Sequence, residues 1–255
     1  MNERYRPILE QLTALSLRLG DPARDLVILG EGNTSAAVDE DVFLIKASGH
    51  SLSSITPEGF VAIRRRPVLD LLEKPSLTDA EVKAGLRAAA VDQSAPPPSV
   101  ETTFHAWLLG LEGARFVAHT HPTAINSLLC ARDGEKIVMG SLFPDQIVIC
   151  GVAPVVVPYT DPGVPLARAI GDGVRAYCDR YGEVPRAVLA RNHGLIAIGE
   201  TAAKVESITA MWVKTARVLL GTLAAGGPQF LTPENVARIH TRPDEEARRK
   251  LLFQG

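Results

Sequence analysis

Three histidines at the ends of two short apolar segments most constrain how this chain folds. His119 and His121 follow the apolar segment 115–118, and His193 follows a second one at 187–190. Short apolar runs bounded by polar residues are typical of buried β-strands. Side chains two residues apart on a strand leave from the same face, so we expect His119 and His121 to converge on one point. With His193, they can fill three corners of a tetrahedral metal site.

Such a site would keep its fourth position open for a substrate. An open position is typical of catalytic zinc, whereas a structural zinc is closed by a fourth protein ligand. Three nitrogen ligands also suit cobalt, manganese or nickel. A single histidine is more often a hydrogen-bonded core or surface residue, and we expect this of His50, His105 and His240. His105 follows Glu101 by one turn of an expected helix, so orienting Glu101 is an alternative role.

The composition is that of an ordinary soluble protein. The chain has 255 residues, of which 46% are hydrophobic and 22% charged, and its formal net charge is -2. The near-zero charge gives no reason to expect nucleic acid or an acidic membrane as partner. We find no apolar run of membrane-spanning length and no signal-peptide pattern. The three cysteines lack a C-x-x-C pair and are typical of reduced thiols. We expect one domain over residues 1–255, in the cytoplasm.

Apolar periodicity predicts helices and short strands interleaved along the chain. We expect helices near 4–19, 78–89, 99–109, 166–181 and 202–223, and strands near 26–29, 43–47, 116–119, 147–150, 155–158, 187–190 and 195–198. Thr78 and Glu81 have the spacing of a capping box. The basic run at 64–66, ahead of a proline, is expected to be a solvated turn. Helices before, between and after short strands favour a layered α/β architecture.

Small polar motifs recur in a fixed order with the histidines. They are Gly30–Ser35, Lys46–Gly49, Pro98–Glu101, the His-Thr-His-Pro piece at 119–122 and the Asn-His-Gly piece at 192–194. In this order they resemble the class II aldolase and adducin family, which includes fuculose- and rhamnulose-phosphate aldolases and ribulose-phosphate epimerases. The resemblance covers roughly residues 26–220. It implies a three-layer α/β/α fold with a mainly antiparallel central sheet, assembled as a homotetramer with active sites between subunits.

The resemblance also implies a metal centre with a neighbouring acid/base. Zinc, or another divalent transition metal, would be held by His119, His121 and His193. Glu101 would lie beside the metal and move protons during carbon–carbon cleavage. It falls in the first turn of an expected helix, where the backbone dipole favours a carboxylate, so capping that helix is its alternative role. The epimerase branch usually carries aspartate here, so a glutamate favours an aldolase.

Residues after the expected strands and at one helix N-terminus are candidate ligands for a substrate phosphate: Asn33, Thr34, Ser48, Gly49 and Ser99. They offer backbone N–H groups and small polar side chains, which favour anions at such positions. Isolated Gly-Asn or Ser-Gly pairs more often serve turns. Many phosphate aldolases have two serines before the glutamate, whereas here Val100 replaces the second. This leaves room for a substrate that is not phosphorylated or that carries a carboxylate.

Taken together, these features predict a zinc-dependent class II aldolase. It would cleave a ketose or ketose 1-phosphate, giving dihydroxyacetone phosphate and an aldehyde. The same scaffold supports 4-epimerisation and metal-assisted decarboxylation, which stay as alternatives. A non-catalytic, adducin-like interaction module is disfavoured because all three histidines and Glu101 are present. The expected partner is a small sugar or sugar phosphate, and we expect neither nucleic acid nor membrane.

Overall fold

The computed structural model describes residues 3–252, and within them seven short strands pair into one sheet. Along the sheet their order is β3-β2-β1-β4-β7-β6-β5, and only the β5–β6 pair is parallel. Their bounds are β1 (Asn33–Ala37), β2 (Val42–Lys46), β3 (Phe60–Arg64), β4 (Phe116–Thr120), β5 (Val155–Val157), β6 (Ala187–Ala190) and β7 (Gly194–Gly199). The expected, mainly antiparallel sheet is therefore confirmed.

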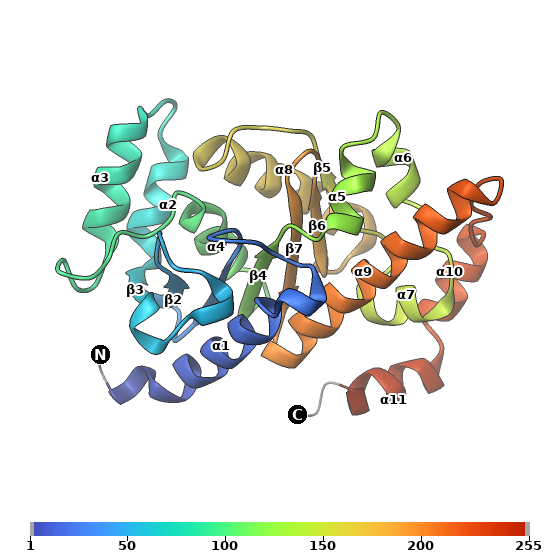
Figure 1. The fold of residues 1–255 in the computed structure, drawn as a ribbon, viewed down its shortest axis with the longest axis horizontal. Coiled ribbons are helices and arrows are strands. Elements are labelled where there is room, and N and C mark those ends of the chain that lie inside the picture. The colour runs from blue at the N-terminus through green and yellow to red at the C-terminus, as the bar shows by residue number, and fades with distance from the viewer. Residues whose placement is uncertain (1–2, 253–255) are drawn as a thin grey trace.

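A layer of helices covers each face of the sheet, as the expected three-layer fold requires. The first face, here called the α1 face, carries α1 (Arg6–Leu19), α5 (Thr123–Leu129), α7 (Pro144–Cys150) and α9 (Ala202–Ala224). The opposite face, the α4 face, carries α2 (Arg65–Glu73), α3 (Asp79–Ala89), α4 (Thr102–Leu108) and α8 (Val164–Tyr181). Figure 1 shows α1 and α9 crossing in front of the strands.

The remaining helices are short or lie outside the two layers. They are α6 (Gly134–Val138), α10 (Pro233–His240), α11 (Pro243–Leu252) and the 3-10 helices η1 (Glu3–Tyr5), η2 (Pro22–Arg24), η3 (Leu52–Ser54) and η4 (Pro57–Gly59). Both α10 and α11 contact α7. In the described part of the chain, no helix combines the length and apolarity needed to cross a membrane.

Side-chain alternation along the central strands separates the two cores. On β4, Phe116 and Ala118 join the core under α1, whereas Val117 joins the core under α4. Since successive strand residues point to opposite faces, His119 projects to the α4 face with Val117. Phe104 of α4 meets the His119 ring edge-on, with the ring centroids 5.7 Å apart. The strand period therefore sets which helix layer can supply partners to the histidine.

The five expected helices and the strands next to the histidines are confirmed. The capping box predicted from Thr78 and Glu81 forms at the start of α3, with both reciprocal hydrogen bonds present. The strands expected at 116–119, 187–190 and 195–198 correspond to β4, β6 and β7. These segments have strong apolar character and stay buried along their whole length, so local pattern and tertiary packing agree.

The strand expected at 26–29 is wrong, because this segment turns at the surface. Ile28 and Leu29 are 64% and 85% exposed, and Leu29 has a φ of 52°. The Glu31 backbone N–H donates to the Ile28 carbonyl at 3.0 Å, which closes the turn. The strand begins instead at Asn33, inside the motif Gly30–Ser35.

Two further expectations are wrong: the strand at 147–150 and the turn at 64–66. Both segments lie near the start of a helix whose first turn contains a proline. Residues 147–150 belong to α7, whose first residue is Pro144, and proline suits the first turn of a helix. All four of these residues are buried, so their continuous apolar run does not distinguish helix from strand. The basic run at 64–66 is not a turn, since Arg64 ends β3 and Arg65 begins α2.

Candidate metal centre

The start of β1, the end of β4 and the start of β7 meet at one edge of the sheet. Asn33 pairs with His119 across β1 and β4, and Thr120 pairs with Leu195 across β4 and β7. His193 precedes β7 in a tight turn, where its backbone N–H donates to the Ala190 carbonyl at 3.1 Å. The antiparallel register therefore brings residues from distant parts of the sequence to the place where His119 lies.

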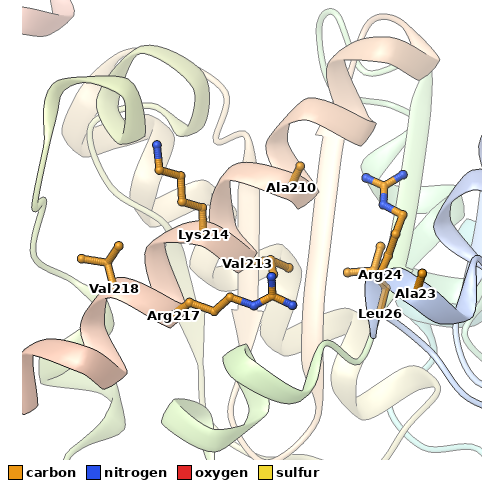
Figure 2. Close-up of a pocket in the computed structure, with 8 residues that line it drawn as sticks. All are labelled: Ala23, Arg24, Leu26, Ala210, Val213, Lys214, Arg217 and Val218. Atoms are coloured by element: carbon orange, nitrogen blue, oxygen red, sulfur yellow. The ribbon is translucent and has the colours of Figure 1, made fainter. Parts of the chain in front are cut away.

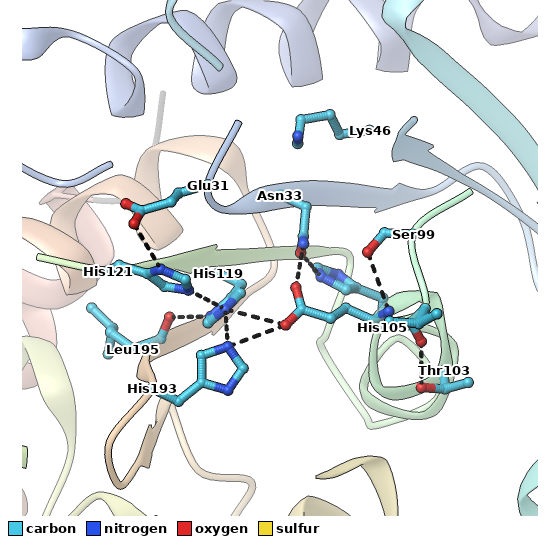
Figure 3. A network of polar contacts seen from close by, with 12 residues as sticks. Glu31, Asn33, Lys46, Ser99, Thr103, His105, His119, His121, His193 and Leu195 are labelled. Atoms are coloured by element: carbon cyan, nitrogen blue, oxygen red, sulfur yellow. Dashed lines mark hydrogen bonds and ion pairs between the residues drawn. The ribbon is translucent and has the colours of Figure 1, made fainter. Parts of the chain in front are cut away.

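The three predicted histidines converge through their ring nitrogens. Nε2 of His119 lies 2.9 Å from Nε2 of His121 and 3.1 Å from Nε2 of His193. One nitrogen from each ring lies within 4.8 Å of the others. Figure 3 shows the rings meeting at one point at the end of β4. Convergence of the three histidines, predicted from the strand period, is present in the structure.

The protonation of His119 directs a lone pair toward this point. Its Nδ1 lies 3.0 Å from the Leu195 backbone carbonyl oxygen, which can only accept, so Nδ1 carries the proton. Burial lowers the pKa of His119 to about 4, although Glu101 opposes that shift, so the imidazole is neutral at pH 7. The lone pair of Nε2 therefore faces two other imidazoles. This donor set fits a divalent transition metal, because such ions bind neutral imidazole nitrogens.

Outer partners hold two of the rings in place. The carbonyl of Leu195 fixes the His119 ring, and the carboxylate of Glu31 lies 3.7 Å from Nδ1 of His121. Glu31 is itself held, because its other oxygen accepts a hydrogen bond from the Ile28 N–H at 3.0 Å. Groups of this kind orient metal-binding histidines and raise their basicity. Sequence reasoning gave Glu31 no role, since its contact depends on the turn at 26–29.

Glu101 lies directly beside the histidines, at the N-terminus of α4. Its Oε1 atom is 3.2 Å from Nε2 of His193 and 3.6 Å from Nε2 of His119. The residue is only 9% exposed. Burial raises the pKa of Glu101, but His119, His193 and Asn33 lower it by more, so the carboxyl group stays ionised. An ionised carboxylate next to the lone pair of His119 and the ring nitrogens of His121 and His193 makes this point attractive to a cation.

The second oxygen of Glu101 is bound on the protein side. Oε2 accepts a hydrogen bond from the side-chain amide of Asn33 at 2.5 Å. The Asn33 carbonyl oxygen lies 2.5 Å from Nε2 of His105, and Nδ1 of His105 lies 2.6 Å from the Ser35 hydroxyl. All of these residues are buried. His105, for which we expected an ordinary core role, thus connects to Glu101 through Asn33.

The structure brings three of the five predicted phosphate ligands together. A bridge between Ala47 and Pro98, with a hydrogen bond from the Ser48 N–H to the Pro97 carbonyl, places Ser48 and Gly49 beside the segment that leads to Ser99. Ser48 and Gly49 are exposed, and the Ser99 hydroxyl accepts a 3.3 Å hydrogen bond from the Glu101 N–H. Ser99 therefore lies next to the acid/base candidate, and Ser48 and Gly49 lie beside the segment that leads to it.

The other two predicted phosphate ligands are placed differently. Asn33 is 4% exposed, and its amide is engaged by Glu101. Thr34 is fully buried, and its hydroxyl lies 2.6 Å from the Ser16 hydroxyl of α1. Because Thr34 alternates with Asn33 on β1, it faces the α1 layer rather than the candidate site. The structure does not bring Thr34 to the histidines.

Lys46 holds together the two glycine-containing loops that flank the site. Its ammonium group donates to the carbonyl oxygens of Gly30 at 3.2 Å and His50 at 2.5 Å. The residue is 3% exposed, and burial lowers its pKa, although Glu101 opposes that shift. Lys46 belonged to a sequence motif, but nothing in the motif showed which carbonyl groups it would bind.

A separate groove of about 530 Å³ lies between α9 and η2, with Leu26 just after η2 also lining it. Figure 2 shows the basic side chains of Arg24, Lys214 and Arg217 along it. Arg24 is already paired with Glu206 at 2.6 Å. None of the three histidines lines this groove. The groove is therefore distinct from the candidate metal centre.

Comparison with known proteins identifies the fold and its relatives. The family described as "Class II Aldolase and Adducin N-terminal domain" matches residues 10–220. A solved structure of the N-terminal class II aldolase domain of a conserved protein from Thermoplasma acidophilum superposes with a TM-score of 0.64 and 28% identity. That superposition covers 83% of this chain and 93% of the other.

Two curated relatives match by sequence. The chain is 32% identical over 183 residues to the "Uncharacterized oxidoreductase YuxG" of Bacillus subtilis (strain 168). This match covers 68% of the chain but only 24% of the relative, so the chain spans about a quarter of that protein. The chain is also 28% identical over 203 residues to the methylthioribulose-1-phosphate dehydratase of Geobacillus kaustophilus (strain HTA426). This match covers 74% of the chain and 81% of the relative.

Proposed function

The chain belongs to the class II aldolase and adducin family, and we propose that it is a metal-dependent aldolase of ketoses or ketose 1-phosphates. The products are dihydroxyacetone phosphate, when the substrate carries a 1-phosphate, and an aldehyde. The observation that carries this proposal is the convergence of His119, His121 and His193 with Glu101 alongside. An adducin-like interaction module has no need for that constellation.

His119, His121 and His193 would hold the metal ion, and we propose zinc. When bound, a divalent ion supplies Lewis-acid stabilisation of the negative charge that develops on substrate oxygen atoms during carbon–carbon cleavage. The protein contributes a neutral imidazole at His119, because burial lowers the pKa of this residue to about 4. It also contributes orientation, because Nδ1 of His119 donates to the Leu195 carbonyl and the Glu31 carboxylate lies 3.7 Å from Nδ1 of His121.

Glu101 is the proposed acid/base. In the condensation direction, its ionised carboxylate removes a proton from the carbon next to the carbonyl group of the three-carbon substrate. In the cleavage direction, it returns that proton to the same carbon after the carbon–carbon bond breaks. Its Oε1 atom lies 3.2 Å from Nε2 of His193, so the carboxylate is beside the residues that would hold the metal.

We propose that the substrate anion is bound at the exposed loop beside Glu101. Gly49 has a φ of 84°, a backbone conformation that would be strained for a residue with a side chain. The Ser48 hydroxyl is exposed beside it. The Ser99 hydroxyl, which accepts from the Glu101 N–H, can donate its own proton to the anion. Backbone and hydroxyl donors of this kind bind phosphate without needing a full positive charge.

A second activity is favoured by one comparison. The Geobacillus relative is named as a dehydratase of a ketose 1-phosphate, and it matches over most of its own length. Loss of water from such a substrate also begins with proton removal next to a carbonyl group. The same acid/base and metal ligands therefore suit dehydration, and product analysis must separate it from cleavage.

The test is incubation of the purified protein, loaded with zinc, cobalt or manganese, with a panel of ketose 1-phosphates. The panel includes fuculose, rhamnulose and methylthioribulose 1-phosphates, with free ketoses and keto acids beside them. Mass spectrometry should detect dihydroxyacetone phosphate and an aldehyde. Loss of 18 mass units (about one water, the chemistry of the dehydratase named above) would identify a dehydratase instead. Unchanged mass with inverted stereochemistry indicates an epimerase, and carbon dioxide release a decarboxylase. Absence of every product would refute the proposal.

We also propose a cytoplasmic homotetramer with active sites between subunits. This rests on the family assignment and on Ser48 and Gly49, whose exposure beside Glu101 leaves one side of the site accessible to another subunit. Light scattering coupled to size-exclusion chromatography tests the assembly. A monomer with full activity would contradict it.

A further inference from the structure

A hydrogen-bonded chain of buried side chains leads from the core to Glu101. It contains Ser35 of β1, His105 of α4 and Asn33 of β1, and it ends on the Oε2 atom of Glu101. The distances along it are 2.6, 2.5 and 2.5 Å. Ser35 and His105 are fully buried, and Asn33 is 4% exposed. In Figure 3, Asn33 lies beside the His105 ring, on the side of the network away from His121.

The carboxylate of Glu101 fixes the donor-to-acceptor direction of these hydrogen bonds. An ionised carboxylate only accepts hydrogen bonds, so Asn33 must turn its NH₂ group toward Glu101 and its carbonyl oxygen toward His105. That oxygen also only accepts, so Nε2 of His105 must carry the proton. Nδ1 is then left as an acceptor for the Ser35 hydroxyl. Each donor therefore points toward the carboxylate.

We propose that His105, held by Ser35, is a positioning residue that acts through Asn33 to fix the carboxylate of Glu101. With Oε2 anchored on the protein side, Oε1 is left facing His119 and His193. The amide of Asn33 serves this anchoring. This inference rests on the proposed acid/base role of Glu101, because the anchoring matters for catalysis only if that carboxylate moves protons.

The placement of these residues supports a role beyond packing. An apolar residue at 105 would stack on Phe104 as the imidazole does, with ring centroids 4.5 Å apart. Such a residue would leave the Asn33 oxygen and the Ser35 hydroxyl without their partner in a dry core. A hydrogen-bonded network that is fully satisfied specifies one arrangement of its members. The arrangement specified here is that of Glu101.

The experiment compares wild type with His105→Phe, His105→Gln and Ser35→Ala, each loaded with zinc. Loss of an outer partner typically lowers activity by about 10- to 100-fold, and we expect this loss in kcat for His105→Phe. The KM of the phosphorylated substrate, the inhibition constant of inorganic phosphate and the zinc content should stay unchanged. His105→Gln retains an N–H donor toward Asn33 and should recover part of the lost kcat. Ser35→Ala tests the same chain if His105→Phe fails to fold.

Ser16→Ala is the matched control, since it removes a buried hydroxyl contact of 2.6 Å on the opposite face of β1. It should leave kcat unchanged. His105→Phe should also cost nothing more in a Glu101→Gln background. A rise in KM and in the phosphate inhibition constant with unchanged kcat would overturn the proposal, because Asn33 would then serve anion binding.

A readout that needs no substrate separates this proposal from the proposed function. Long-range nitrogen–proton correlation spectra of histidine-labelled protein should show His105 protonated on Nε2. The tautomer protonated on Nδ1 would refute the chain, whatever the activity. If wild type turns over none of the substrates but His105 is protonated on Nε2, the proposed function fails while the anchoring of Glu101 stands.

Discussion

Gly194 lies so close to His121 that a Cβ atom at this position would come within 2.8 Å of the His121 ring. The same atom would lie 2.5 Å from the Thr120 carbonyl oxygen and 3.2 Å from the His119 ring. The absence of a side chain at Gly194 therefore allows β4 and β7 to pair while both rings occupy one site.

The first prediction concerns Gly194→Ala. The added methyl group should displace β7 or the His121 ring, and overpacking of this kind costs about 1–3 kcal/mol in the free energy of unfolding. Zinc affinity should fall in parallel. Denaturant unfolding and competition with a chelator measure the two effects. Gly221→Ala in α9 is the control, because a Cβ atom there would meet nothing within 4 Å beyond its chain neighbours and the backbone of its own helix. Unchanged zinc affinity in Gly194→Ala would contradict this account of the site.

The second prediction concerns the metal ligands. Replacement of His119, His121 or His193 by alanine should abolish stoichiometric zinc binding, because each ring supplies one of the converging nitrogens. His240→Ala is the control, since that histidine pairs with Glu183, outside the site. Metal content after dialysis is the measurement. Removing the metal from wild type should also lower the thermal unfolding midpoint, because a ligand of the native state stabilises it.

The third prediction concerns the proposed acid/base. Glu101→Gln keeps the size of the side chain and an oxygen for the Asn33 amide, but it cannot take up a proton. Removing a general acid/base typically lowers turnover by about 10²- to 10⁴-fold. Zinc content and thermal stability should change little in comparison. Glu112→Gln, at an exposed position, is the control. Full activity of Glu101→Gln would remove the carboxylate from the mechanism.

The fourth prediction concerns pH and an ion pair away from the site. Burial raises the pKa of Glu206, but hydrogen bonds from Arg18 and Arg24, each at 2.6 Å, lower it by more. A carboxyl group with a depressed folded pKa stabilises the native state above its unfolded pKa and loses that effect as pH falls through its folded pKa. Glu206→Gln should therefore reduce the unfolding free energy at neutral pH by about 1 kcal/mol or less, because these groups are partly exposed.

This destabilisation should shrink as the pH drops below 4.5, the ordinary pKa of the group. Chemical unfolding of wild type and Glu206→Gln across the acidic range measures it. Glu10→Gln, an exposed substitution on α1, controls for the loss of one negative charge. A difference between wild type and Glu206→Gln that persists at the lowest pH would show that the ion pairs are not its cause.

The histidine site was predictable because its information is local. A period of two brings His119 and His121 to one face, and an apolar strand leads to His193. The chain behind Glu101 was not predictable in this way. Asn33 contacts Glu101 and His105 across 68 and 72 residues of sequence, so only the folded register brings them together.

The errors in predicted structure have a related cause. β1 has the sequence Asn-Thr-Ser-Ala-Ala, which has little apolar or β-branched character, yet its first four residues are buried. Their polar groups are satisfied by distant partners, such as Ser16 for Thr34 and His105 for Ser35. The segment at 26–29 has the stronger apolar pattern but turns at the surface. Tertiary hydrogen bonding, rather than local propensity, determines where this strand lies.

The alternation of Asn33 and Thr34 on β1 makes this strand intolerant of length changes. An inserted residue ahead of Asn33 that shifted the pairing by one position would turn the asparagine toward α1 and present the threonine hydroxyl to Glu101. The Glu101 carboxylate would lose its amide donor, and the Asn33 amide would be buried against the apolar core under α1. A register shift of β1 would therefore disrupt the face that carries Asn33 and the face that carries Thr34 at the same time.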